Sequence, residues 1–93
     1  MDFLELFNAL LKHNALGVRG GSAATSYEQV PFDIGLDSLD MVLVMVTFAE
    51  AFGLPEGATV DRISTTTLGD LRDFVLKHKT KEPESLEQFL EAA

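Results

Sequence analysis

The chain has 93 residues, 46% of them hydrophobic, and its 15 acidic and 7 basic residues give a formal net charge of −8. This length fits one small domain with a single core, and the composition is that of a globular protein. The negative charge excludes nucleic acid and anionic membrane as favoured partners, because it repels both. The chain has no cysteine, which excludes disulfides and thiolate metal sites, and His13 and His78 are too few for a histidine-based zinc site.

The N-terminal residues predict a helix that ends before Gly17. Its apolar residues recur at helical intervals: Phe3, Leu4, Phe7, Leu10 and Leu11. Asp2 and Glu5 have the spacing of a capping box. The opening stretch MDFLELF carries acids where a signal or transit peptide carries basic residues, and no apolar run is long enough to span a membrane. We therefore expect a cytoplasmic protein without membrane insertion.

A long connection follows, from Ala15 to Leu36, in which the helical pattern fails. It contains the glycine-rich string GVRGGS and the proline of VPFD, which disfavours helix at Val30. Structureless connections of this length are uncommon in compact domains. We expect Val30, Phe32 and Ile34 to pack under the helices and hold the connection in place.

A second helix is predicted from Ser38 to Phe52, because Gly53 stops it and Pro55 prevents it from resuming. A short third helix is expected at Thr59–Ile63. Thr67 and Asp70 then have capping-box spacing at the start of a further helix. The apolar stripe of that helix consists of Leu68, Leu71, Phe74 and Val75.

The last residues, 82–93, form a C-terminal extension that either docks as a short helix or frays. Ser85 and Gln88 have capping spacing, and docking is favoured because three large apolar residues share one face. Those residues are Leu86, Phe89 and Leu90. No segment has the period of a strand. The fold class predicted is all-α: a small bundle of three major helices with a long first loop, a short third helix and an extra C-terminal helix, in a main domain over residues 1–81.

The predicted helix Ser38–Phe52 is apolar on two sides. At 100° per residue, one side is a core-facing stripe: Met41, Val44, Met45, Phe48 and Phe52. The roughly opposite side carries Leu39, Val42, Leu43 and Val46 and closes with Glu50. Two interpretations are open. Either the long loop and the tail cover this second stripe, or it is exposed as a protein-docking surface.

Ser38 stands at the head of that stripe in the string DSLD. Asp37 or Ser38 could cap the helix, and Asp40 in the first turn suits the helix dipole, so capping alone explains a string this short. The string is not the G-x-S-x-G of a hydrolase elbow, and its acids do not have the spacing of a calcium loop. No neighbouring base is evident, and the sequence therefore predicts neither a catalytic nor a metal site, and no enzyme.

Taken together, the surrounding residues resemble the acyl carrier protein family. The resemblance rests on DIGLDSLDMVLVMVTFAEAFGLP followed by ISTTTLGDLRDFV: a glycine two residues before D-S-L, a helix with an aromatic near its end, a G-L-P break, and a final helix that opens on T-x-x-D-L. It extends from about Phe3 to Lys79. Its family fold, a small bundle with a long first loop, also accounts for the long connection.

The resemblance implies that Ser38 is an attachment site. In that family a phosphopantetheinyl transferase attaches a 4′-phosphopantetheine arm from coenzyme A to the serine, and the thiol of the arm carries an acyl group as a thioester. Asp37 and Leu39 would be the immediate recognition context. The implied partners are acyl-loading, condensing or acyl-transferring enzymes of fatty-acid, polyketide or related biosynthesis, with the carrier itself a monomer.

Further residues receive roles from the second stripe and from the resemblance. The partner-binding candidates are Asp40, Val42, Leu43, Val46 and Glu50. The candidates for lining an acyl pocket are Val44, Phe48, Ile63, Leu71 and Phe74. Leu43 and Ala49 stand where fatty-acid carriers usually have glutamates, which indicates a specialised carrier whose partners bind a more apolar helix.

Two alternatives remain open. An aminoacyl, aryl or D-alanyl carrier would use the same arm with another cargo, although Asp37 before the serine favours the acyl or polyketide type. An unmodified helical interaction module would use the second stripe for binding and leave Ser38 as a cap.

Overall fold

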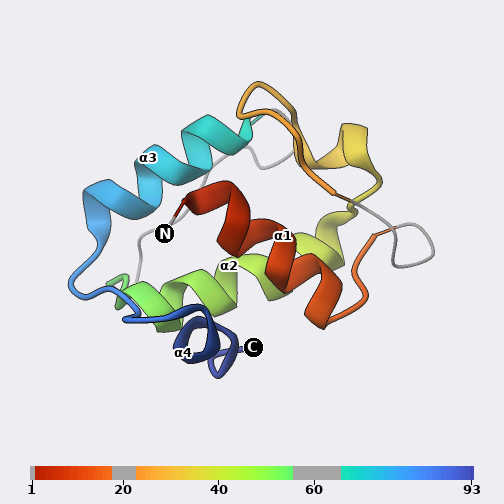
Figure 1. Cartoon of the computed structure of the whole chain (residues 1–93). Coiled ribbons are helices and arrows are strands. Elements are labelled where there is room, and N and C mark those ends of the chain that lie inside the picture. The colour runs from red at the N-terminus through yellow and green to blue at the C-terminus, as the bar shows by residue number, and fades with distance from the viewer. Residues whose placement is uncertain (1, 18–22, 56–65) are drawn as a thin grey trace.

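The computed structural model describes residues 2–17, 23–55 and 66–93 (Figure 1). Within these ranges the chain is helical and contains no strand, so the all-α prediction is confirmed for them. The elements are α1 (Phe3–His13), the 3-10 helix η2 (Pro31–Ile34), α2 (Ser38–Phe52), α3 (Leu68–His78) and α4 (Leu86–Leu90). The short helix expected at Thr59–Ile63 lies outside the described residues. α2 packs against both α3 and α4, and α4 also packs against α1.

The longest helix, α2, begins and ends at the residues that the sequence predicts. Asp37 is its N-cap, and the Asp37 carboxylate accepts the backbone N–H of Asp40 at 2.9 Å. At the other end Gly53 adopts a φ of 61°, the left-handed conformation that glycine reaches at least cost. Met41, Val44, Phe48 and Phe52 of the predicted core stripe are buried, and Met45 packs against them half-buried.

Aromatic side chains from three helices meet in the core. The ring of Phe48 on α2 lies 4.8 Å from that of Phe3 on α1 and 4.9 Å from that of Phe89 on α4, measured between centroids. Phe89 is fully buried. The C-terminal residues thus form a docked helix, with Ser85 as the N-cap that accepts the Gln88 N–H at 3.1 Å. The docking favoured from the sequence is the arrangement observed.

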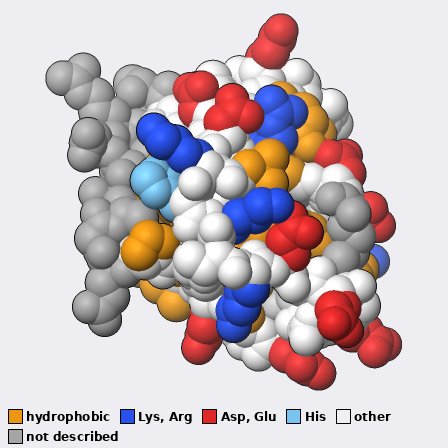
Figure 2. Space-filling view, turned by 90° about the vertical axis from the view of Figure 1, so that its left-hand side faces the viewer, with side chains coloured by type: hydrophobic (Ala, Val, Ile, Leu, Met, Phe, Trp, Pro, Cys, Tyr) orange, Lys and Arg blue, Asp and Glu red, His pale blue; other side chains and the backbone are white. Residues whose placement is uncertain are grey.

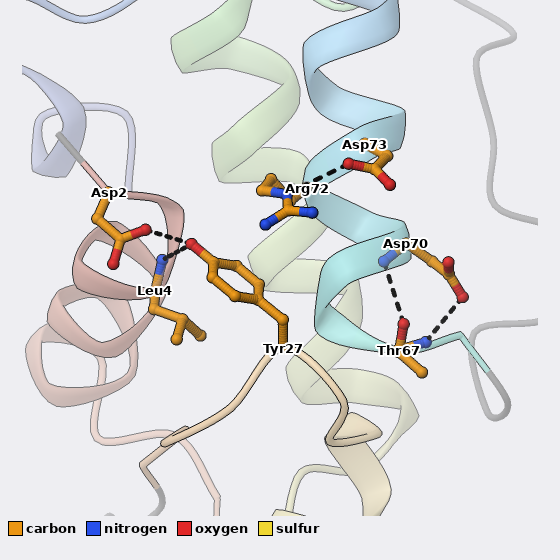
Figure 3. A network of polar contacts seen from close by, with 7 residues as sticks. All are labelled: Asp2, Leu4, Tyr27, Thr67, Asp70, Arg72 and Asp73. Carbon is orange, nitrogen blue, oxygen red and sulfur yellow. Dashed lines mark hydrogen bonds and ion pairs between the residues drawn. The ribbon is translucent and has the colours of Figure 1, made fainter.

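Tyr27, in the long connection, contacts the start of α1 and also α3 (Figure 3). Its hydroxyl donates to the Asp2 carboxylate and accepts the Leu4 N–H at 3.3 Å, both at the start of α1. The guanidinium of Arg72 on α3 lies over the Tyr27 ring, 4.3 Å from its centroid. A hydrogen bond with Asp73 raises the pKa of that guanidinium above its ordinary value. One side chain therefore links the loop, α1 and α3.

The capping box expected between Asp2 and Glu5 is wrong. Asp2 is the N-cap residue of α1, but its side chain makes no capping hydrogen bond. The physical reason is competition: the Asp2 carboxylate bonds to the Tyr27 hydroxyl, 25 residues away in the chain. A local spacing rule cannot include a partner that only the tertiary fold supplies.

The connection is held in place, but of the three residues expected to pack under the helices only Ile34 packs against the core. Phe32 is 39% exposed, and Val30 and Ile34 are only half-buried, whereas Pro31 and Leu36 are buried. The tight turn of η2 causes this shift, because its backbone rotates Phe32 outward while Ile34 still packs against the core.

The start of α3 confirms the predicted capping box. The Thr67 hydroxyl accepts the Asp70 N–H at 3.1 Å, and the Asp70 carboxylate accepts the Thr67 N–H at 3.3 Å (Figure 3). Two further amides of the first turn donate to the connection, Leu68 to Gln29 and Gly69 to Tyr27, both at 2.9 Å. These bonds satisfy donors that a helix start leaves without partners in the helix itself.

Candidate functional site

Ser38 is the first residue of α2, and its side chain is exposed. The two interpretations of the DSLD string can now be separated, because Asp37 and not Ser38 caps the helix. In the described part of the chain, no hydrogen bond involves the Ser38 hydroxyl. Among the described residues, the Ser38 hydroxyl therefore lies at the surface and makes no structural hydrogen bond.

The backbone before Ser38 explains why a glycine precedes the string. Gly35 follows η2 with a φ of 91°, a conformation that a side chain would strain. Its turn is closed by the Gly35 N–H, which donates to the Phe32 carbonyl at 3.3 Å, and by the Leu36 N–H, which donates to the Pro31 carbonyl at 3.1 Å. Leu36 is then buried, and Asp37 and Ser38 emerge at the surface.

Asp40 completes this helix start. Its carboxylate oxygen Oδ2 accepts two backbone N–H groups, from Asp37 and from Gly17, each at 3.2 Å. Asp40 is a partner-binding candidate, but its carboxylate also links Gly17, which follows α1, to the start of α2 by a hydrogen bond. The two amides partly offset its negative charge next to Ser38.

The local electrostatics of the helix start favour an anion on the Ser38 oxygen in one respect and oppose it in another. The amides of Ser38 and Leu39 have no acceptor in the described residues, and they lie at the positive end of the α2 dipole. The carboxylates of Asp37 and Asp40 add negative charge beside them. A cationic group on an approaching protein would be attracted to the same place.

The second apolar stripe of α2 is exposed, which answers the question left open by the sequence. Leu39 is 75% exposed, Val42 57%, Leu43 49% and Val46 56%. We call these four residues the α2 apolar face. They have the spacing i, i+3, i+4, i+7, by which a helix presents one continuous ridge. The face begins beside Ser38 and ends near Glu50, which is also exposed.

The acyl-pocket candidates line neither of two prominent clefts among the described residues. Val44, Phe48 and Leu71 are fully packed in the core, Phe74 is half-buried, and Ile63 lies outside the described residues. The larger cleft, about 400 Å³, lies instead between α1, α3 and residues 82–83. The smaller, about 270 Å³, lies between the end of α2 and the C-terminal residues. No local pattern of residues indicates either cleft, because both arise from how the elements pack.

Two observations limit the chemistry of the described residues. They contain no group of three or more His, Cys, Asp or Glu side chains that could hold a metal ion. Likewise, no helix in the described ranges has the length and apolarity needed to cross a membrane.

Comparison with known proteins adds no assignment: no family model, no curated protein and no solved structure matches the chain. The resemblance to acyl carrier proteins is therefore a matter of the motif around Ser38 and its place at a helix start.

Proposed function

We propose that the protein is an acyl carrier that holds acyl groups as thioesters on a 4′-phosphopantetheine arm attached to Ser38. The observation that carries the proposal is the exposed Ser38 hydroxyl at the first residue of α2, where Asp37 does the capping. Modification of this hydroxyl would break no hydrogen bond among the described residues. The motif that extends from Asp33 to Pro55 and resumes at Ile63 supports the same function.

The physical chemistry of the site suits such an arm. A phosphodiester on Ser38 would lie beside the free amides of the first turn and the positive end of the helix dipole. A flexible arm that starts at the surface can present one tethered substrate to successive enzymes at high effective concentration. The chemistry would belong to those enzymes, and the carrier itself would supply no catalytic group.

The α2 apolar face is the surface we propose for partner enzymes, including the transferase that loads the arm. Exposed apolar patches of this kind mark interaction sites. The face runs directly from the attachment residue, so an enzyme that docks on it would have the arm in its active site. With Leu43 and Ala49 in place of glutamates, partners would bind through apolar contact more than through charge, as in a specialised carrier of fatty-acid, polyketide or related biosynthesis.

The test is to incubate the purified chain with coenzyme A and a broad-specificity phosphopantetheinyl transferase and to measure its intact mass. We expect the gain of one phosphopantetheine group in the wild type and in Ser85→Ala, and none in Ser38→Ala. Ser85 is the matched control, since it also stands at a helix start but acts as the cap. An unchanged wild-type mass, or a gain that persists in Ser38→Ala, would refute the proposal.

The exposed α2 apolar face also favours a second candidate, an unmodified interaction module. The interaction-module function predicts no mass gain in the transferase experiment. It also predicts a protein partner whose binding is lost in Leu43→Glu. If modification does occur, the thioester found on the native protein separates an acyl cargo from an aminoacyl, aryl or D-alanyl cargo.

A further inference from the structure

The larger cleft, about 400 Å³, has a size typical of small-molecule sites. It lies between α1, α3 and residues 82–83, and within the described part of the chain neither Ser38 nor the α2 apolar face contributes to its lining. Figure 2 views the molecule from the side on which α3 ends, and it shows apolar side chains between basic and acidic ones. The cleft is therefore a separate candidate site, to which the proposed function assigns no role.

Much of the lining of this cleft is apolar and aromatic. Four buried core residues border it: Phe3, Leu6, Phe52 and Val75. Tyr27 also lines it, with its ring 6.4 Å from that of Phe3 between centroids. Contact with an apolar body would remove this surface from water, and aromatic rings pack well against one another. The lining therefore suits a ligand with an aromatic body.

Three charged side chains line the cleft, and two of them are already paired. The Arg72 Nε donates to the Asp73 carboxylate at 3.2 Å, and the guanidinium lies over the Tyr27 ring. Glu82 forms an ion pair with Lys79, and the hydrogen bond from Lys79 lowers the pKa of Glu82 below its ordinary value. The charges of Arg72 and Glu82 are thus offset by neighbouring residues.

Asp2 is the third charged residue of the lining, and it differs from the other two. Its carboxylate accepts the Tyr27 hydroxyl, which is neutral, and it forms no ion pair within the described residues. Figure 3 shows this carboxylate at the hydroxyl end of Tyr27, with Arg72 near the ring. In the described ranges the cleft therefore has one unpaired negative charge beside an apolar surface. The formal net charge of −8 on the whole chain also attracts cations.

We propose that this cleft binds a small organic amine whose ammonium group pairs with the Asp2 carboxylate and whose aromatic body covers the apolar lining. An anion of the same shape would be repelled by Asp2 and by the field of the chain. A neutral analogue would lack the ion pair. The proposal goes beyond the carrier function and does not depend on it, because Ser38 takes no part in the cleft. A bound amine would leave the α2 apolar face open to a partner enzyme.

The first test compares three probes that share an indole ring and a two-carbon chain: tryptamine, tryptophol and indole-3-propionate. The protein has no tryptophan, so indole fluorescence reports each probe directly. At low salt, tryptamine should bind wild type at least about threefold more tightly than tryptophol, as expected for an exposed ion pair. Indole-3-propionate should bind most weakly. Equal affinities for the three probes, or no binding of tryptamine, would overturn the proposal.

A pair of variants tests the role of Asp2. Asp2→Asn keeps an oxygen that can accept the Tyr27 hydroxyl but removes the negative charge, so it should bind tryptamine and tryptophol equally. Asp33→Asn is the matched control, because Asp33 is also exposed and lies in η2, outside the lining of the cleft. It removes the same charge from the chain and should retain the preference for tryptamine. Loss of the preference in both variants, or in neither, would refute the site.

Two further variants test the location of the amine while leaving Asp2 in place. Leu76 borders the cleft and is 47% exposed, and Leu43 on the α2 apolar face is 49% exposed. Leu76→Arg should weaken tryptamine binding by about threefold or more, because it adds a positive charge beside the bound ammonium group. Leu43→Arg adds the same charge elsewhere and should leave the affinity unchanged. Equal affinities of the two variants, or weaker binding in Leu43→Arg alone, would contradict binding in this cleft.

Discussion

α2 and α3 begin in the same way and differ in what they carry beyond that. Each has a capping box with an aspartate at its third residue, Asp40 in α2 and Asp70 in α3. In α3 the N-cap is the hydroxyl residue Thr67. In α2 the N-cap is the acid Asp37, and the hydroxyl of Ser38 makes no hydrogen bond with the described residues. α2 also carries the α2 apolar face, whose four side chains are each about half exposed or more. α2 therefore has two features that the described part of the fold does not use, the Ser38 hydroxyl and the α2 apolar face, and these are the features we assign to function.

The largest effect expected from this comparison concerns two leucines. Leu71 on α3 is 1% exposed and Leu43 on α2 is 49% exposed. Leu71→Ala should lower the free energy of unfolding by about 2–5 kcal/mol, because it leaves a cavity in the core. Leu43→Ala should change it by less than about 0.5 kcal/mol, as for surface positions in general. Urea denaturation of both variants measures the difference, and similar losses would mean that the α2 apolar face serves the fold.

Substitutions at the two helix starts should differ by less. Thr67→Ala removes the side-chain acceptor for the Asp70 N–H and should cost about 1 kcal/mol of unfolding free energy. Ser38→Ala removes no hydrogen bond of the described residues and should stay within about 0.5 kcal/mol of wild type. The same denaturation experiment measures both. If Ser38→Ala lost as much unfolding free energy as Thr67→Ala, the claim that the Ser38 hydroxyl does not stabilise the fold would be wrong.

The smallest expected effect on stability, with a clear effect on recognition, comes from Leu43→Glu and its control Leu76→Glu. The two leucines are similarly exposed, 49% on α2 and 47% on α3. Both variants should stay within about 0.5 kcal/mol of wild type in unfolding free energy. Only Leu43→Glu should reduce kcat/KM of the transferase reaction, by about tenfold, because a charge in an apolar contact is unfavourable. Equal transferase kinetics in the two variants would argue against the α2 apolar face as the docking surface.

Much of the local structure could be predicted because its signals lie within a few residues. The bounds of α2 follow from Asp37, Gly53 and Pro55. Helical periodicity places Leu43 on a second apolar stripe, but only the structure shows that this stripe is exposed and not covered by the loop or the tail. The capping box of α3 could likewise be predicted, because it joins Thr67 and Asp70, which are three residues apart in the sequence.

What could not be predicted depends on contacts between distant residues. The Asp2 carboxylate has a nearer candidate partner in its own helix start, but Tyr27 reaches it through the fold. Phe32 is 39% exposed, against the expectation that it packs under the helices, because the turn at η2 rotates the chain, and hydrophobicity alone does not show that rotation. Asp37 and Ser38 were both suitable caps, so only the geometry at α2 could separate them.

The decisive measurement for Ser38 as the attachment site is the intact mass of the wild-type chain and of Ser38→Ala, taken side by side after incubation with coenzyme A and the transferase. The carrier account predicts one added phosphopantetheine group on the wild type and an unchanged mass for Ser38→Ala, with both proteins folded. No added mass on the folded wild type, or the same added mass on both, would contradict it.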